Sequence, residues 1–156
     1  MSAHASNEPR EVAIVGGGIG GLTLALSLHA AGLKPRGFER APRLIEAGAG
    51  IQLSPNAMRV MRALGLEHAL IPFAFAPEAL EMCDGVSGRH VFSIRAQQRR
   101  WGAPYLHLHR ADLVAVLEQT LEARVPGALT TDAGVTAIED DGEQVTLSFA
   151  DGTHVA

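Results

Sequence analysis

A single cysteine, Cys83, occurs among the 156 residues of the chain. One cysteine excludes an internal disulfide bond and every motif that needs a Cys-x-x-Cys pair, whether for redox chemistry or for zinc. No histidine that could activate a thiolate adjoins Cys83, so we expect this side chain to be a small buried hydrophobe. The absence of disulfides favours a reducing compartment, and we expect a cytoplasmic protein.

The chain also lacks an excess of positive charge and a long apolar segment. Its 13 basic and 17 acidic residues give a formal net charge of −4, which excludes the positive field that attracts nucleic acid or an anionic membrane. Residues 1–11 have no apolar stretch typical of a signal peptide, and no apolar run is long enough to span a bilayer. With 47% hydrophobic and 19% charged residues, the composition is that of a globular domain behind a flexible tail at residues 1–11. We expect neither nucleic acid nor a membrane as partner.

A short apolar run followed by three glycines opens the folded part of the chain. Residues 12–15 predict a strand that is buried on both faces of a parallel sheet. The Leu- and Ala-rich stretch 19–31 predicts a helix, with Gly32 just past its end. Residues 35–39 are predicted as a second strand from their position, because Pro35 is a poor strand residue. The order of strand, helix and strand is that of a βαβ unit.

The middle of the chain predicts a second helix and then antiparallel strands. A Gly-rich loop leads into a strand at 51–53, and residues 54–55 (Ser-Pro) supply an N-cap and a favourable first helical position. The apolar face of this helix is expected to consist of Ala57, Val60, Met61 and Leu64. Prolines and glycines punctuate residues 72–100, where we expect antiparallel strands at 80–82 and 90–94.

The last third predicts a helix followed by two turns. Asp112 is expected to open the helix, and a Pro-Gly pair to close it. The apolar face of this helix is expected to consist of Leu113, Val116, Leu117 and Leu121. An Asp-Asp-Gly turn separates predicted strands at 135–138 and 145–149. A second turn, at residues 151–152, is followed by only four residues, so we expect the chain to end within an element and to be the front part of a longer protein.

Residues 16–21 (GGGIGG) contain a Gly-x-Gly-x-x-Gly motif between the predicted strand and helix. In such a turn Gly16 permits a tight bend, Gly18 lets the backbone approach a diphosphate, and Gly21 permits close packing of the helix. Glu39 lies 18 residues after Gly21, near the spacing of about 20 at which an acidic residue reaches the ribose of an adenine dinucleotide. Its carboxylate would repel a 2′-phosphate and so disfavours NADP. The alternative is a glycine turn that binds nothing, beside a solvated Glu39, and these residues alone leave FAD and NAD open.

Three further segments resemble one family of flavoenzymes. Residues 39–40 resemble the "ER" pair that ends its second strand, residues 48–57 (GAGIQLSPNA) resemble its "GAGI.L.PNA" segment, and residues 109–113 (HRADL) resemble its "HR.DL" element. Nearly the whole chain after the tail is therefore similar to the class A flavoprotein monooxygenases, the group of the salicylate and hydroxybenzoate hydroxylases. The resemblance implies a Rossmann-type α/β fold that binds FAD and carries an antiparallel β insertion.

The resemblance also implies a division of the chain. Residues 12–70 would form the FAD-binding βαβ segment, residues 71–105 a β-rich segment of the substrate domain, and residues 106–156 a helix and hairpins of the FAD domain. The family pattern continues with "GADG" and "GD" segments that contact FAD, and neither occurs in this sequence. We expect both beyond Ala156, together with the catalytic residues and much of the substrate pocket, so that the FAD domain is truncated at its C-terminal side.

The same resemblance implies a set of FAD contacts. The backbone that would hold the diphosphate belongs to Gly16, Gly18, Ile19, Gly20 and Gly21. Glu39 would bind the adenosine ribose, and Arg40 would lie beside the adenosine. Arg110 would reach the FAD through a planar guanidinium, which can donate several hydrogen bonds to ribose and phosphate oxygens. Gln52 would lie near the flavin end, and Val135 would offer its backbone to the adenine.

For the parent enzyme the resemblance implies a monooxygenase. NADH or NADPH, as a transient reductant, would reduce the FAD, O2 would then form a flavin C4a-hydroperoxide, and this would hydroxylate a small, electron-rich aromatic acid. One alternative is a related flavin monooxygenase of the urate, epoxidase or polyketide type. The other is a non-catalytic remnant that only holds a dinucleotide. The sequence leaves the exact substrate, the choice of nicotinamide and the oligomeric state open.

Two further groups of residues invite a functional interpretation. Tyr105, His107 and His109 alternate along a predicted strand, so the two histidines share a face, but no third metal ligand lies nearby and we expect no metal site. A basic and aromatic cluster consists of Arg95, Arg99, Arg100, Trp101 and Tyr105. We expect an exposed loop there, with docking of a nicotinamide phosphate as the alternative.

Overall fold

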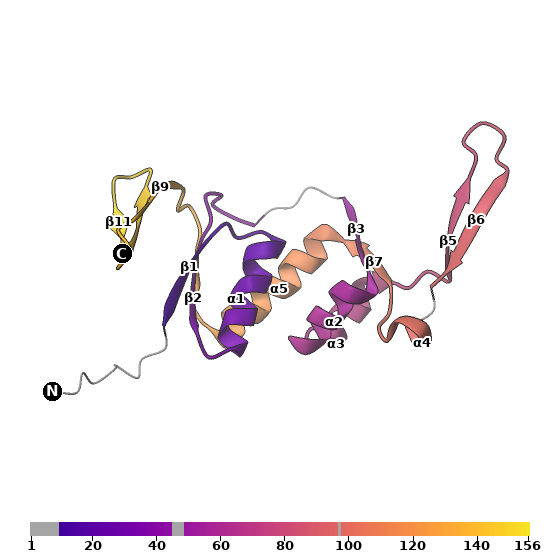
Figure 1. Ribbon diagram of the computed structural model, residues 1–156, viewed down its shortest axis with the longest axis horizontal. Coiled ribbons are helices and arrows are strands. Elements are labelled where there is room, and N and C mark those ends of the chain that lie inside the picture. The colour runs from indigo at the N-terminus through magenta and orange to yellow at the C-terminus, as the bar shows by residue number, and fades with distance from the viewer. Residues whose placement is uncertain (1–9, 45–48, 97) are drawn as a thin grey trace. The chain divides into compact units, whose positions relative to one another are not determined.

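The computed structural model describes residues 10–44, 49–96 and 98–156 (Figure 1). The chain divides into two compact units, residues 1–45 with 117–156 and residues 46–116. Helices and strands are mixed in both units, as the sequence predicts for an α/β protein. Among the described residues, no helix is long and apolar enough to cross a membrane.

The first unit begins with the predicted βαβ arrangement. β1 (Glu11–Val15) and β2 (Lys34–Phe38) pair in parallel, and α1 (Ile19–Ala30) connects them. β8 (Leu129–Thr130) adds to the other edge of β2, where it pairs with the last two residues of that strand. The sheet order β1-β2-β8 confirms the second strand, which the sequence supports mainly through its position.

Two poor strand residues fit into β2 for local reasons. Pro35 lacks an N–H that could bond a neighbouring strand. β8 pairs with β2 only from Gly37 onward, so Pro35 costs no hydrogen bond to β8. The N–H of Gly37 donates to the carbonyl oxygen of Ala128 (2.6 Å). A Cβ on Gly37 would lie 2.9 Å from Cδ1 of Leu129, so the glycine lets β8 come close to β2.

The end of α1 is fixed by backbone hydrogen bonds. The N–H of Leu33 donates to the carbonyl oxygen of Leu28 (2.9 Å), and the N–H of Gly32 donates to that of His29 (2.9 Å). This is a Schellman motif, which needs a left-handed residue directly after the C-cap. Gly32 has a φ of +79°, so its predicted place just past the helix end is confirmed. The side chains that α1 buries are Leu22, Ala25 and Leu26.

The prediction that β1 is buried on both faces is wrong. Ile14 is buried and faces α1, because a Cβ on Gly21 would lie 3.5 Å from its Cγ2. Val15 points to the opposite face and is 54% exposed. Among the described strands, β1 lies at the edge of its sheet with β2 as its neighbour. A continuous apolar run in the sequence therefore does not show whether one face or both faces of the strand are buried.

The C-terminal part of the first unit is an antiparallel sheet of order β11-β10-β9. Its strands are β9 (Val135–Asp140), β10 (Val145–Phe149) and β11 (His154–Val155). Phe38 of β2 packs against Leu147 and Phe149, and the centroids of the two phenylalanine rings are 5.0 Å apart. Both predicted turns are confirmed, with positive φ angles at Gly142 and Gly152.

A short strand returns after the turn at residues 151–152, although only four residues follow this turn. β11 returns along β10, and Val155 lies opposite Leu147 (Figure 1, yellow). The carboxylate of Asp151 accepts the N–H and the hydroxyl of Thr153 at 2.9 and 2.7 Å. These bonds close a tight turn, so a strand of two residues is enough to pair.

The second unit contains a three-stranded antiparallel sheet of order β3-β7-β4 and a separate ribbon of β5 and β6. Its elements in chain order are β3 (Gly50–Leu53), α2 (Pro55–Ala63), α3 (Glu67–Leu70), the 3-10 helix η1 (Ile71–Phe73), β4 (Ala74–Phe75), β5 (Ala79–Cys83), β6 (His90–Arg95), α4 (Gln98–Trp101) and β7 (Leu106–His109). The strands predicted at 80–82 and 90–94 are confirmed as β5 and β6. α5 (Arg110–Arg124) follows β7. The sequence predicts that this helix starts at Asp112, but it begins two residues earlier, at Arg110. Its predicted apolar face is buried: Leu113, Val116, Leu117 and Leu121.

The buried face of α2 is rotated by about one position from the prediction. Met61 and Leu64 are buried as expected, but Val60 is 44% exposed and Met58 is fully buried. Both possible stripes contain Met61 and Leu64, so the spacing alone does not decide which flanking residue turns inward. Ser54 is at the N-cap as predicted, although its hydroxyl bonds the side chain of Asn56 and no backbone N–H of the helix.

The prediction that Cys83 is buried is wrong, because Cys83 is exposed. It ends β5, one strand of the two-stranded ribbon, and every residue of β6 is exposed as well. Neither face of β6 is covered by another layer of the described residues, so strand formation here does not bury side chains. The loop expected around Arg100 also differs, since residues 98–101 form the short helix α4.

Candidate functional site

The glycine loop after β1 has the geometry that its sequence predicts. Gly16 has a φ of +107°, which side chains disfavour. A Cβ on Gly21 would lie 1.9 Å from the carbonyl oxygen of Gly16, so this glycine lets α1 start directly against the loop. The N–H of Gly16 donates to the carbonyl oxygen of Phe38 (2.8 Å). The loop is thereby joined to the end of β2.

The outer side of the loop is open and rich in hydrogen-bond donors. Apart from the adjoining backbone, no described atom lies within 4 Å of the positions that Cβ atoms of Gly18 and Gly20 would occupy. Gly18 is the N-cap of α1 and Ile19 its first residue, and no side chain caps this end. The first N–H groups of a helix have no partner within the helix and carry a partial positive charge. The arrangement fits the diphosphate of a dinucleotide.

Glu39 is bound to the glycine loop, which sequence reasoning missed. Its Oε2 accepts the N–H of Gly17 at 2.6 Å, and its Oε1 accepts the N–H of Ala41 at 2.9 Å. A Cβ on Gly17 would lie 2.9 Å from the Cβ of Glu39, so only glycine leaves room for this approach. A carboxylate oxygen has further lone pairs, so Glu39 can still accept a ribose hydroxyl. The close contact of Gly17 with a strand end 22 residues later has no sequence signal of its own.

Glu39 carries a negative charge at neutral pH. The N–H of Ala41 and then that of Gly17 lower the pKa of its carboxyl from the ordinary value of 4.5, while partial burial acts in the opposite direction. An ionised acid at this place would repel a 2′-phosphate, in line with the sequence prediction that NADP is disfavoured as the ligand of this loop.

Glu39→Gln is expected to reduce stability at pH 7 but not at low pH. The amide can accept only one of the two N–H groups, and its own NH2 meets the other donor. Because the folded-state pKa of Glu39 is lowered, its stabilisation is fully present above 4.5 and is lost as the pH falls through the lower folded value. Urea unfolding of both proteins at pH 7, 5 and 3 measures the difference. A difference that stays constant down to pH 3 would contradict the ionic role.

The loop before β9 lies beside Glu39 and Arg40. The N–H of Ala133 donates to the carbonyl oxygen of Glu39 (2.8 Å). A Cβ on Gly134 would lie 3.6 Å from the Cβ of Arg40. Val135 follows as the first residue of β9 and is half-buried. The structure thus gathers the glycine loop with Glu39, Arg40 and Val135 in the first unit, while their contacts with FAD stay predictions.

Gln52 and Arg110 lie together in the second unit. Gln52 is in β3 opposite His107 of β7, and Arg110 is the residue directly after β7. The N–H of Arg110 donates to the carbonyl oxygen of Ala49 (3.0 Å), just before β3. The Oε1 of Gln52 accepts the hydroxyl of Tyr105 at 2.7 Å. The expected roles of both side chains toward FAD remain predictions.

Of the alternating Tyr105, His107 and His109, the first two make a ring contact in the structure. The Tyr105 and His107 rings meet edge to face with centroids 5.3 Å apart. The Nε2 of His107 is buried without a hydrogen-bond partner in the described part of the chain. Within residues 10–44, 49–96 and 98–156, no three His, Cys, Asp or Glu side chains are grouped so that they could hold a metal ion.

Relatives of known activity match almost the whole chain. It is 40% identical over 153 residues to the 3-amino-4-hydroxybenzoate 2-monooxygenase PtmB3 of Streptomyces platensis, a match that covers 96% of this chain and 38% of the relative. It is 36% identical over 146 residues to the 3-hydroxybenzoate 6-hydroxylase of Polaromonas naphthalenivorans, covering 91% of this chain and 36% of the relative. The chain spans about two fifths of the length of these curated relatives.

Solved structures share the fold. The tetrameric form of 2-methyl-3-hydroxypyridine-5-carboxylic acid oxygenase is 24% identical with a TM-score of 0.82, over 96% of this chain and 38% of that one. Klebsiella pneumoniae HpxO complexed with FAD and uric acid is 24% identical with a TM-score of 0.77, over 94% and 36%. Residues 10–154 match the family described as FAD binding domain. The chain therefore belongs to the FAD-binding domain family, in the group of the class A flavin-dependent aromatic hydroxylases that its motifs resemble.

Proposed function

We propose that the whole protein is an FAD-dependent monooxygenase that hydroxylates a small aromatic carboxylic acid with O2 and NADH or NADPH. The observation that carries the proposal is the open glycine loop bound to an ionised Glu39, in a chain of the FAD-binding domain family. The relatives above 30% identity include enzymes named for aminohydroxybenzoate, hydroxynicotinate and hydroxybenzoate, which are all ring carboxylates. A cytoplasmic location is part of the same proposal.

The residues of the first unit would hold the adenosine diphosphate half of the cofactor. The N–H groups at the start of α1 would bind the diphosphate, and Glu39 would accept a ribose hydroxyl while it keeps the loop in place through Gly17. Arg40 would lie beside the adenosine, and the backbone of Val135 would face the adenine. Because the loop is already closed by its own hydrogen bonds, little ordering would be needed on binding.

The residues of the second unit would meet the flavin half. Gln52 is oriented by the hydroxyl of Tyr105, and Arg110 would donate hydrogen bonds to ribose or phosphate oxygens. When bound, FAD supplies the redox chemistry, since it takes electrons from the nicotinamide and activates O2. The protein's part is to position the aromatic ring and to exclude water.

The whole protein, loaded with FAD, is expected to oxidise NADH or NADPH faster when a ring acid is added. Candidate acids are 3-hydroxybenzoate, 6-hydroxynicotinate and 3-amino-4-hydroxybenzoate, and the matching alcohols without a carboxylate serve as controls. Stimulated oxidation with one 18O atom from 18O2 in the product would support the proposal. Tight FAD binding without stimulation by any ring acid would favour a binding module instead.

A further inference from the structure

A cavity of about 540 Å³, open to solvent, lies in the second unit beside the first turn of α2. The guanidinium-bearing Arg59 of α2 and Arg100 of α4 line it, and none of the described residues that line it is acidic. In the described part of the chain neither arginine forms an ion pair with a carboxylate. The first turn of α2 also contains no acidic residue, so the cavity favours an anion.

The other walls of the cavity suit a flat ring. Trp101 and Tyr105 supply aromatic surfaces, and Leu80 of β5 and Ile94 of β6 supply an aliphatic one. Leu80 and Ile94 lie directly opposite each other in the ribbon, so they form one continuous apolar patch. Apolar and aromatic walls with a few polar groups are typical of small-molecule sites.

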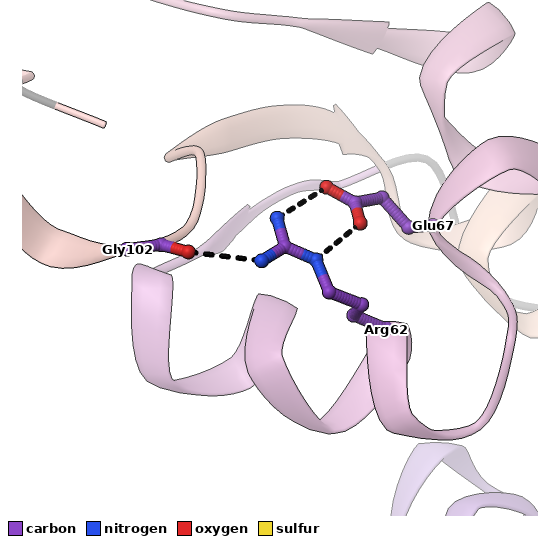
Figure 2. Close-up of polar contacts among 3 residues, drawn as sticks. All are labelled: Arg62, Glu67 and Gly102. Carbon is purple, nitrogen blue, oxygen red and sulfur yellow. Dashed lines mark hydrogen bonds and ion pairs between the residues drawn. The ribbon is translucent and has the colours of Figure 1, made fainter. Parts of the chain in front are cut away.

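Arg62 bonds both Glu67 and the backbone of Gly102 (Figure 2). Its Nε and Nη2 donate to Oε2 and Oε1 of Glu67 at 2.5 and 2.8 Å, and its Nη1 donates to the carbonyl oxygen of Gly102 at 2.9 Å. Gly102 directly follows Trp101, so Arg62 ties that backbone to α2 across 40 residues of sequence. The carboxyl of Glu67 has a lowered pKa because Arg62 hydrogen-bonds it, and the pair stays ionised at neutral pH.

We propose that this cavity binds the aromatic acid, with the carboxylate between Arg59 and Arg100 and the ring against Trp101 and Tyr105. Guanidinium groups suit a carboxylate, because they are planar, permanently charged and offer paired donors. The location fits a substrate, since Tyr105 bonds Gln52, the residue predicted to lie at the flavin end. The inference rests on the proposed function for the identity of the ligand.

The test uses the fluorescence of Trp101, which is the only tryptophan among the 156 residues of the chain. In the whole protein loaded with FAD, 3-hydroxybenzoate and 3-amino-4-hydroxybenzoate are titrated while the emission of this tryptophan is followed. Where further tryptophans exist in the whole protein, Trp101→Phe identifies the signal that belongs to the cavity. At least one acid is expected to change the emission with saturation, whereas 3-hydroxybenzyl alcohol, which lacks the carboxylate, is expected to bind roughly tenfold or more weakly.

Arg59→Met and Arg100→Met keep much of each side chain's apolar stem and remove the charge. Each is expected to weaken binding of the acid by roughly ten- to a hundredfold, because a charge-assisted hydrogen bond is lost. Arg59→Lys keeps the charge without the paired donors, so it is expected to lose less affinity for the acid than Arg59→Met does. Arg89→Met, at the turn of the β5–β6 ribbon outside the cavity wall, is the matched control and is expected to leave the affinity unchanged. Unchanged FAD binding in all variants shows that they are folded.

The outcomes separate this inference from the proposed function. Acid-stimulated NADH oxidation with unchanged affinity in both methionine variants would overturn the cavity and leave the function standing. Acid binding that depends on both arginines, without any hydroxylation, would support the cavity and overturn the function. A raised KM for NADH with unchanged acid affinity would overturn the assignment as well, since the cavity would then serve the nicotinamide dinucleotide.

Discussion

Gly21→Ala is expected to lower the free energy of unfolding by about 3 kcal/mol or more, because the new methyl group has no space. Its Cβ would lie 1.9 Å from the carbonyl oxygen of Gly16 and 3.0 Å from the carbonyl carbon. Both atoms belong to a backbone that is fixed by the hydrogen bond from Gly16 to Phe38. The helix would therefore have to move away from the loop, and its buried contacts would be lost.

Gly20→Ala is the matched control for this prediction. Gly20 is the neighbouring residue in the same turn of α1, and apart from the adjoining backbone no described atom lies within 4 Å of its added Cβ. Alanine is the better helix former, so a gain of about 0.5 to 1 kcal/mol is expected. Thermal unfolding of the two variants without added flavin makes the comparison. Similar losses in both would show that the close approach at Gly21 does not limit stability.

The steric part of the site is predictable from sequence because it is local. A tight bend at Gly16 and close packing at Gly21 follow from the spacing of glycines between a strand and a helix. The bond between Glu39 and the N–H of Gly17 is different, since it joins two strand ends. The sequence places Glu39 at the correct distance along the chain but carries no information on which donors its carboxylate meets.

Burial was the least predictable property, for a physical reason. Val15, Val60 and Cys83 are apolar or small residues in well-predicted elements, and all three are exposed. Each lies on a strand or helix with one covered face or none. The local sequence pattern predicts whether a segment is a helix or a strand, but not which of its faces is buried. Which face is covered depends on residues distant in sequence, as the shift from Val60 to Met58 in α2 illustrates.

Glu39→Ala in the whole protein is expected to weaken FAD binding by about 1 to 3 kcal/mol, or roughly five- to a hundred-and-fiftyfold in Kd. Two losses contribute to this effect. A ribose hydroxyl would lose a charged acceptor, and the N–H of Gly17 would lose the carboxylate that it bonds at 2.6 Å. Titration of the apoprotein with FAD, followed by flavin fluorescence, measures the sum. Unchanged affinity would remove Glu39 from the site.

A double-mutant cycle with ADP and 2′-deoxy-ADP separates the two losses. If Glu39 accepts the 2′-hydroxyl, the deoxy compound should bind the wild type more weakly than ADP does, and Glu39→Ala should bind both alike. If Glu39 acts only through Gly17, the variant should lose the same factor for both ligands, because the diphosphate is common to them. Because the pKa of Glu39 is lowered, its side chain is negatively charged at pH 7 and should repel a further phosphate. ADP that carries a 2′-phosphate should bind the wild type poorly at pH 7. Its affinity relative to that of ADP should rise in the variant, which lacks the negative charge.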